Sequence, residues 1–89
     1  MRQVIEENAY TFKFLDESDS YPYAIGKKAH GIHAINNDSS NELLVILTYS
    51  TGGTITIPVP ANTTYNNRFS SFTIVNTSGS TNYNIGIEE

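Results

Sequence analysis

Residues 43–65 read LLVILTYSTGGTITIPVPANTTY, a stretch without a single Lys, Arg, Asp or Glu. Its beginning, Glu42–Tyr49, is nearly all apolar, which predicts a strand covered on both faces and therefore the central strand of the domain. The sequence Thr51-Gly52-Gly53-Thr54 then predicts a tight reversal, because glycine accepts the positive φ that hairpin turns require. The return arm, Thr54–Val59, alternates apolar and polar residues, so residues 43–59 are predicted to form a β-hairpin.

Two prolines mark the end of this hairpin. Pro58 and Pro60 flank Val59, and proline cannot donate a backbone hydrogen bond to a neighbouring strand. The return arm is therefore predicted to end at a sheet edge. The following segment, Ala61–Ser71, is predicted to be a loop or a crossover between sheets.

Period-2 alternation also dominates the other segments that can be interpreted, and no window has the spacing of an amphipathic helix. The further predicted strands are Ala9–Leu15, Ala29–Ile35, Phe72–Asn76 and Tyr83–Ile87, with Tyr23–Ile25 as a short edge segment. The last two strands are predicted to form a hairpin around the loop TSGSTN. The aromatic residues assigned to the core are Phe12, Phe14, Phe69 and Phe72, with Tyr10 on the same face as Phe12 and Phe14.

Six or seven short strands with turn residues between them predict an all-β fold. We expect a small antiparallel β-sandwich, jelly-roll or Ig-like, with a small barrel as the other solution. A chain of 89 residues forms one domain, 1–89, in which residues 1–8 are predicted to be a flexible N-terminal arm. The chain has no cysteine, so neither disulfides nor thiolate metal sites support its modest core.

Charge is scarce and unevenly placed. The net charge is −4, and residues 43–87 contain only Arg68 as a charged residue, whereas Thr, Ser and Asn make up 29 of the 89 residues. This balance argues against nucleic-acid binding, which needs clustered Lys and Arg. The opening MRQVIEENAY has acids where a signal peptide would be apolar, and no apolar run approaches the about 20 residues of a membrane span. We therefore expect no secretion signal and no membrane partner.

No catalytic or metal-ligating pattern stands out. His30 and His33 are three residues apart on a predicted strand, which should place their side chains on opposite faces and exclude a shared metal. The acidic groups at Asp16–Asp19 and around Asp38 lack EF-hand spacing and are interpreted as solvated turns, with calcium binding left open. We predict no cofactor, no catalytic residues and no enzyme; a small hydrolase would need a histidine beside a carboxylate and a hydroxyl.

Tyrosines near predicted loops are the candidates for binding. Tyr21, Tyr23 and Tyr65 could present rings to a saccharide or a protein, although they could equally close the ends of the core. The predicted interaction surface consists of Tyr21, Tyr23, Asn62, Tyr65, Asn67 and Arg68.

Residues 31–78 resemble small β-sandwich modules in structural proteins of tailed bacteriophages and prophages. The likeness lies in an Asn-Asp-Ser turn that leads into an apolar strand, then a glycine hairpin, a Val-Pro/Ala loop and an FxxFxI strand. The resemblance implies a virion component that is assembled in the host cytoplasm, such as a capsid decoration, a head fibre or a tail accessory protein. It implies no catalytic residues.

A surface without charge is either merely soluble or covered in a symmetric assembly, where unpaired charge is disfavoured. We therefore expect a non-enzymatic structural or binding module of a bacteriophage virion, acting through homo-oligomeric contacts or contacts with other virion proteins. The alternative is a module that binds carbohydrate or a host receptor through the loop tyrosines.

Overall fold

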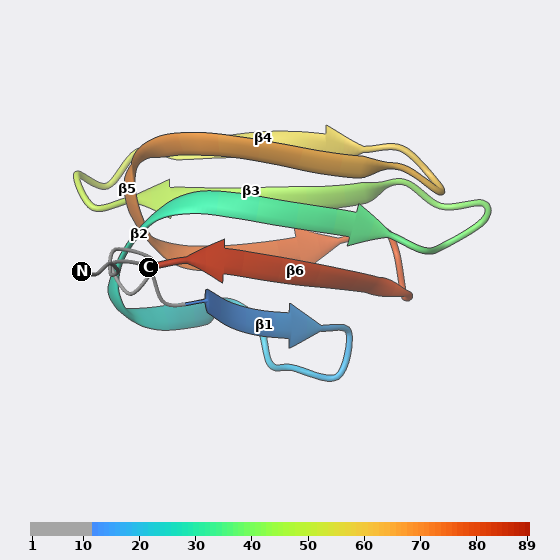
Figure 1. Ribbon diagram of the computed structural model, residues 1–89, viewed down its shortest axis with the longest axis horizontal. Coiled ribbons are helices and arrows are strands. Elements are labelled where there is room, and N and C mark those ends of the chain that lie inside the picture. The colour runs from blue at the N-terminus through green and yellow to red at the C-terminus, as the bar shows by residue number, and fades with distance from the viewer. Residues whose placement is uncertain (1–11) are drawn as a thin grey trace, which may run out of the picture.

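The computed structural model describes residues 12–89, which form an all-β domain (Figure 1). Its strands are β1 (Phe12–Asp16), β2 (Tyr23–Asn36), β3 (Leu43–Tyr49), β4 (Thr54–Val59), β5 (Thr64–Ser78) and β6 (Tyr83–Glu88). All neighbouring pairs are antiparallel, in the order β1-β6-β2-β5-β3-β4. The predicted all-β class is confirmed, and the six strands of the described residues agree with the predicted six or seven. The predicted arm, residues 1–8, lies outside the described residues, as do Ala9 and Tyr10 of the first predicted strand.

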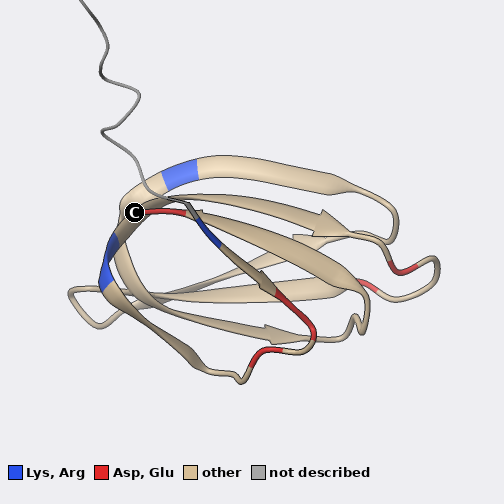
Figure 2. Ribbon diagram, turned by 60° about the horizontal axis from the view of Figure 1, so that its bottom comes forward, with Lys and Arg blue, Asp and Glu red and all other residues tan. Residues whose placement is uncertain are grey.

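Two long strands fold this single sheet into two layers. In β2, Tyr23 pairs with Val75 near the end of β5, whereas residues 31–35 pair with residues 64–68 at its beginning. Both strands turn back at the same end of the molecule, so each contributes one half to each layer (Figures 1 and 2). The front layer contains β1, β6, the second half of β2 and the first half of β5. The back layer contains β4, β3 and the remaining halves of β5 and β2.

The core lies between the two layers. It is formed by the buried apolar side chains Leu15, Ile25, Ala29, Ile32, Ala34, Leu43, Val45, Leu47, Ile57, Val59, Phe72, Val75, Tyr83, Ile85 and Ile87. Phe72 is the largest fully buried side chain, and Phe69 packs nearly perpendicular to it with ring centroids 6.5 Å apart. The alternation of buried and outward residues is most regular in β3 and β4.

The assignment of Phe14 to the core was wrong. In β1, Leu15 is buried and Phe14 is 76% exposed. Two adjacent apolar residues allow either phase of the alternation, and a shift by one residue exchanges the faces of a strand. The side chain of Phe12 lies outside the described part.

The hairpin predicted for residues 43–59 is confirmed. β3 pairs with β4 from Leu43–Val59 to Thr48–Thr54, and Gly52 in the turn has φ 104°. β4 is an edge strand, as its prolines indicate. β3 is second from this edge rather than central, because β5 and β2 occupy the middle of the sheet.

Two predicted connections were wrong. Most of the segment Ala61–Ser71, predicted as a loop or a crossover between sheets, is regular strand, the first half of β5, and its partner is the distant strand β2. The TSGSTN segment does not close a hairpin, because β6 pairs with β1 and β2 and not with β5. This segment instead carries the chain from the back layer to the front layer.

His30 and His33 are both exposed, although strict alternation predicted opposite faces. The pairing of β2 with β5 has a register irregularity between Ala29 and Gly31, and Gly31 and Ile32 are buried in succession. A β-bulge of this kind interrupts the alternation of side chains. The separate short segment predicted at Tyr23–Ile25 is continuous with this strand.

The buried amide of Asn36 ties the layers together at the end opposite the bend. Its Nδ2 donates to the carbonyl oxygens of Val59 in β4 and of Asn41, at 3.0 and 2.9 Å. Its Oδ1 accepts from the Ser80 hydroxyl at 2.8 Å and from the backbone N–H of Asp38 at 3.1 Å. One side chain thus satisfies four groups from β4 and two loops, which fixes the positions of these segments.

Candidate functional site: the two outer faces

Rows of register partners cross the front layer. Phe14, Gly86, His33 and Asn66 follow one another across β1, β6, β2 and β5. Their sequence neighbours point into the core, so these residues point outward. We call the outward side of this layer the front face, which comprises Phe14, Gly31, His33, Ile35, Asn66, Arg68, Asn84, Gly86 and Glu88.

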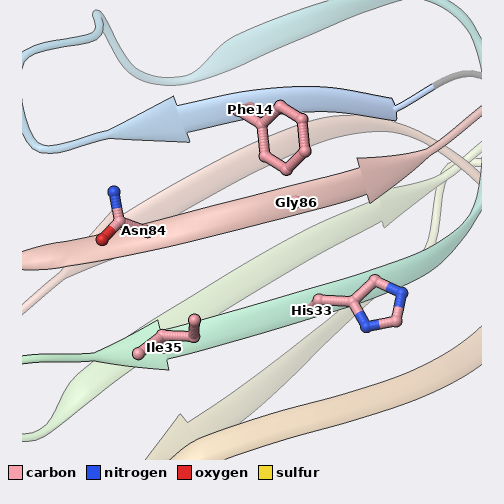
Figure 3. Close-up of a pocket in the computed structure, with 5 residues that line it drawn as sticks. All are labelled: Phe14, His33, Ile35, Asn84 and Gly86. Carbon is pink, nitrogen blue, oxygen red and sulfur yellow. The ribbon is translucent and has the colours of Figure 1, made fainter.

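An apolar hollow of about 450 Å³ lies on the front face, lined by Phe14, His33, Ile35, Asn84 and Gly86 (Figure 3). Phe14 and Ile35 are the exposed large hydrophobic residues of the part that the structure describes, at 76% and 42% exposed. Isolated exposed apolar side chains are common on protein surfaces, but here both border the same hollow.

Gly86 forms the floor of the apolar hollow. A Cβ atom at this position would lie 3.5 Å from Cε1 of Phe14 and 3.7 Å from Cβ of His33, which are ordinary contact distances. The Phe14 ring therefore lies beside the glycine backbone, as aromatic side chains do where they shield a glycine in a neighbouring strand. The lack of a side chain lets another group approach the strand closely.

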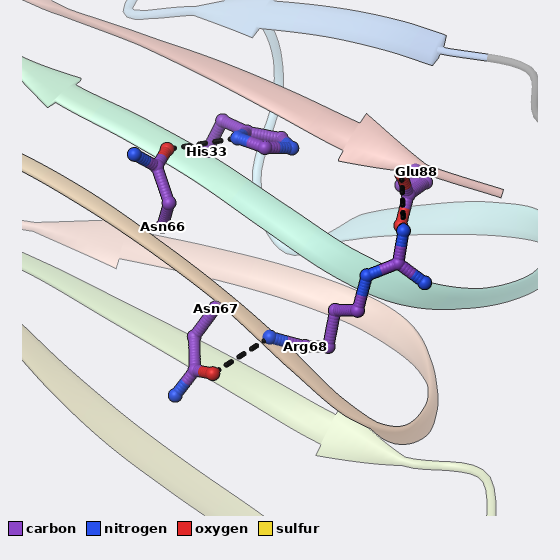
Figure 4. Close-up of polar contacts among 5 residues, drawn as sticks. All are labelled: His33, Asn66, Asn67, Arg68 and Glu88. Carbon is purple, nitrogen blue, oxygen red and sulfur yellow. Dashed lines mark hydrogen bonds and ion pairs between the residues drawn. The ribbon is translucent and has the colours of Figure 1, made fainter.

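A second, polar hollow of about 300 Å³ adjoins the first at His33 and is lined also by Asn66, Asn67, Arg68 and Glu88 (Figure 4). His33 Nδ1 lies 2.8 Å from Oδ1 of Asn66, and this hydrogen bond fixes the orientation of the imidazole ring. Arg68 Nη2 donates to Glu88 Oε2 at 3.1 Å and lies 2.9 Å from Oε1.

The ion pair between Arg68 and Glu88 crosses a glycine. Both residues are register partners of Gly31, so the ion pair passes over β2. A Cβ atom at Gly31 would lie 2.6 Å from Glu88 Oε1, closer than such atoms approach. The side chain of Glu88 is 8% exposed and that of Arg68 is 62% exposed, so the carboxylate is sheltered while the guanidinium reaches solvent.

The outward side of the back layer is different. We call the part of it formed by β4, β3 and β5 the back face, and its residues are Leu44, Ile46, Thr48, Thr54, Thr56, Pro58, Ile74, Asn76 and Ser78. None of these residues is charged, and in Figure 2 the Lys, Arg, Asp and Glu residues lie elsewhere. Leu44, Ile46 and Ile74 are partly exposed. The back face is thus neutral across three strands.

The predicted tyrosines are part of the framework. Tyr21 donates its hydroxyl to the Asp16 carbonyl oxygen at 2.7 Å, and its ring lies 6.2 Å from that of Tyr83. Burial, followed by the hydrogen bond to Tyr83, raises the pKa of Tyr21.

Tyr23 lies under the Lys13 ammonium group, whose nitrogen is 5.5 Å from the ring centroid. Tyr65 accepts from Asn67 Nδ2 at 3.0 Å, and all three tyrosines pack against the core.

The predicted interaction residues are dispersed over the molecule. Asn62 lies in the turn before β5 with φ 58°, away from the front-face hollows. Asn67 and Arg68 are the two that line the polar hollow. The sequence reasoning missed Phe14, Ile35 and Gly86. A signal for Gly86 was present, since a glycine inside a predicted strand indicates close approach of another group.

The acidic loops use their carboxylates to shape turns. Asp38 Oδ1 accepts from the backbone N–H groups of Ser40 and Asn41, both at 3.0 Å. The Ser40 N–H and then the Asn41 side chain hold the pKa of Asp38 well below its usual range. Among residues 12–89, no three His, Asp or Glu side chains are grouped so that they could hold a metal ion.

No family model matches this chain, and no curated protein and no solved structure matches it either. Within the described residues there is no helix with the length and apolar character needed to cross a membrane. The chemistry of the two outer faces is therefore the basis for inferring a function.

Proposed function

We propose that this protein is a non-enzymatic structural module that associates with further copies of itself through the neutral back face. One observation carries the proposal, namely the absence of charge from all nine residues that β3, β4 and β5 present outward there. The proposed setting is a virion, where many copies act as a capsid decoration or tail accessory protein.

Association of two surfaces removes water from the side chains at their centre. Burying an unpaired charge in an interface costs several kcal/mol, so the centres of stable interfaces are depleted of charged residues. Two copies of a face that contains Thr, Asn and three aliphatic side chains can meet without any unpaired charge. A face of this kind suits a two-fold contact, in which the same patch serves both partners.

The resemblance to phage structural modules supports the virion setting. Residues 31–78, which carry it, include β3, β4, the turn between them and all of β5. The back face lies within this range, and the charged residues of the range, Asp38, Glu42 and Arg68, are not part of that face.

A matched pair of substitutions tests the proposal. Ile46→Lys places a charge at the centre of the back face, and Ile35→Lys places the same charge on the front face. In sedimentation velocity over a concentration series, we expect the native protein and Ile35→Lys to associate and Ile46→Lys to remain monomeric. Circular dichroism controls for folding. A native protein that stays monomeric throughout, or an Ile46→Lys variant that associates like the native protein, would overturn the proposal.

A further inference from the structure

The two hollows of the front face lie side by side, and we call them together the groove. They share His33, with the apolar hollow on one side and the polar hollow on the other. Along β6 the groove runs from Asn84 past Gly86 to Glu88, four steps from residue to residue or about 13 Å. Its two ends therefore differ in polarity.

The apolar end suits a flat ring with C–H groups on one face. Phe14 is 76% exposed, and its ring lies beside the backbone of Gly86. The faces of pyranose rings carry C–H groups that pack against the electron-rich faces of aromatic rings. Because Gly86 has no side chain, such a ring can lie against both the Phe14 ring and the strand.

The rim of the groove offers oriented polar groups. Asn84 Oδ1 accepts from Asn37 Nδ2 at 3.0 Å, and Asn66 Oδ1 binds His33. Each bond fixes an amide whose NH₂ group remains able to donate at the surface. At the far end the exposed Arg68 supplies donors, and the sheltered Glu88 carboxylate balances its charge. Oriented donors and acceptors beside an apolar floor are typical of sites that recognise hydroxyl groups.

We propose that this groove binds a neutral oligosaccharide, with one sugar ring against Phe14 and Gly86 and the next directed toward Asn66, Arg68 and Glu88. A disaccharide or trisaccharide spans the length of the groove. Five residues line the apolar hollow, whereas a protein partner engages about 20 to 30 residues a side. The lining has no charge in excess, which favours a neutral ligand over an acidic one. The site is separate from the back face and does not depend on self-association.

A pair of glycine substitutions tests the groove without disturbing its polar groups. Gly86→Ala adds a methyl group to the floor at ordinary contact distances, so the protein should still fold. The methyl group would occupy the space in which the sugar ring lies. Gly26→Ala adds the same group where no atom lies within 4 Å and serves as the control. Phe14→Ala removes the stacking surface and should weaken binding by about tenfold.

The measurement is a glycan array followed by titration calorimetry with neutral trisaccharides, including cellotriose, chitotriose and maltotriose. We expect the native protein and Gly26→Ala to bind at least one of them equally, and Gly86→Ala to bind it at least tenfold more weakly. Absence of any glycan binding by the native protein overturns the proposal, as does unchanged affinity in Gly86→Ala. If Phe14→Ala changes the state of association while no glycan binds, the groove is a protein contact, and the role of the back face is judged separately by Ile46→Lys.

Discussion

The front and back layers share two strands and one core, yet their outer faces have little chemistry in common. The front face has an ion pair, an imidazole, an exposed aromatic ring and two glycines, whereas the back face has uncharged side chains alone. The inward sides are similarly aliphatic. The requirements of the core thus fix the inward residues in both layers and leave the outward residues available for two different kinds of contact. Substitutions in the two faces and at their junction test this difference.

Substitution of Asn36 should destabilise both layers, because this amide joins the end of β2 to β4 and to two loops. Asn36→Ala removes four hydrogen bonds and leaves buried groups unsatisfied, so the free energy of unfolding should fall by about 3 kcal/mol. Chemical denaturation measures the loss. Asn84→Ala, on the surface of the adjacent strand, is the control and should cost under about 0.5 kcal/mol. Equal effects of the two changes would contradict the role assigned to Asn36.

The two front-face glycines should respond differently to the same change. Gly31→Ala forces the Glu88 side chain away from its position over β2 and should cost about 2 kcal/mol, as overpacking does. Gly86→Ala meets only ordinary contacts and should be close to neutral for stability. Thermal and urea unfolding of both variants provide the comparison. A neutral Gly31→Ala variant would show that Glu88 is free to move.

Without the ion pair, the contribution of the front face to the free energy of unfolding should depend on salt as little as that of the back face does. Arg68→Met leaves the sheltered Glu88 carboxylate without its partner, which should cost about 1 kcal/mol, because the guanidinium is largely solvated. The native protein should lose this contribution gradually as NaCl is added, since salt screens exposed charges. Thr56→Ala on the back face should leave the salt dependence unchanged. Urea unfolding over a NaCl series checks both statements.

The smallest effect is expected in the loop between the layers, where Asp38 shapes the turn from β2 to β3. Its folded-state pKa is lowered, so its contribution to stability is full above the unfolded pKa of about 3.9 and is lost as the pH falls through the folded value. Asp38→Asn should therefore lower the Tm at neutral pH, and its difference from the native protein should shrink below about pH 4. Calorimetry across this range makes the measurement. A difference that grows on acidification would contradict the assignment.

Local chemistry determined what the sequence could predict. The hairpin of β3 and β4 depends on a glycine turn and on alternation within adjacent segments, and both are readable in order along the chain. The prolines placed β4 at an edge for the same reason, because a missing donor is a property of the residue itself. These features do not require knowledge of distant partners.

Long-range pairing determined what the sequence could not predict. The first half of β5 is polar, which is typical of loops, but β2 supplies its partner from far away in the chain. The front-face groove has the same origin, since Phe14, His33 and Gly86 come from three strands and meet only through register. No local pattern in the sequence shows that they are neighbours.

The bend that β2 and β5 share has a consequence for unfolding. Because each of these strands is half of one layer and half of the other, neither layer can separate as an intact unit. The last half of β5 also completes the ladder beside β3, so a chain cut between β4 and β5 would keep only the ladder of β3 with β4, and every other pairing would join the two fragments. We therefore expect a single cooperative transition in which the two faces are lost together. Ligand binding at the front face would then protect the back face from unfolding as well.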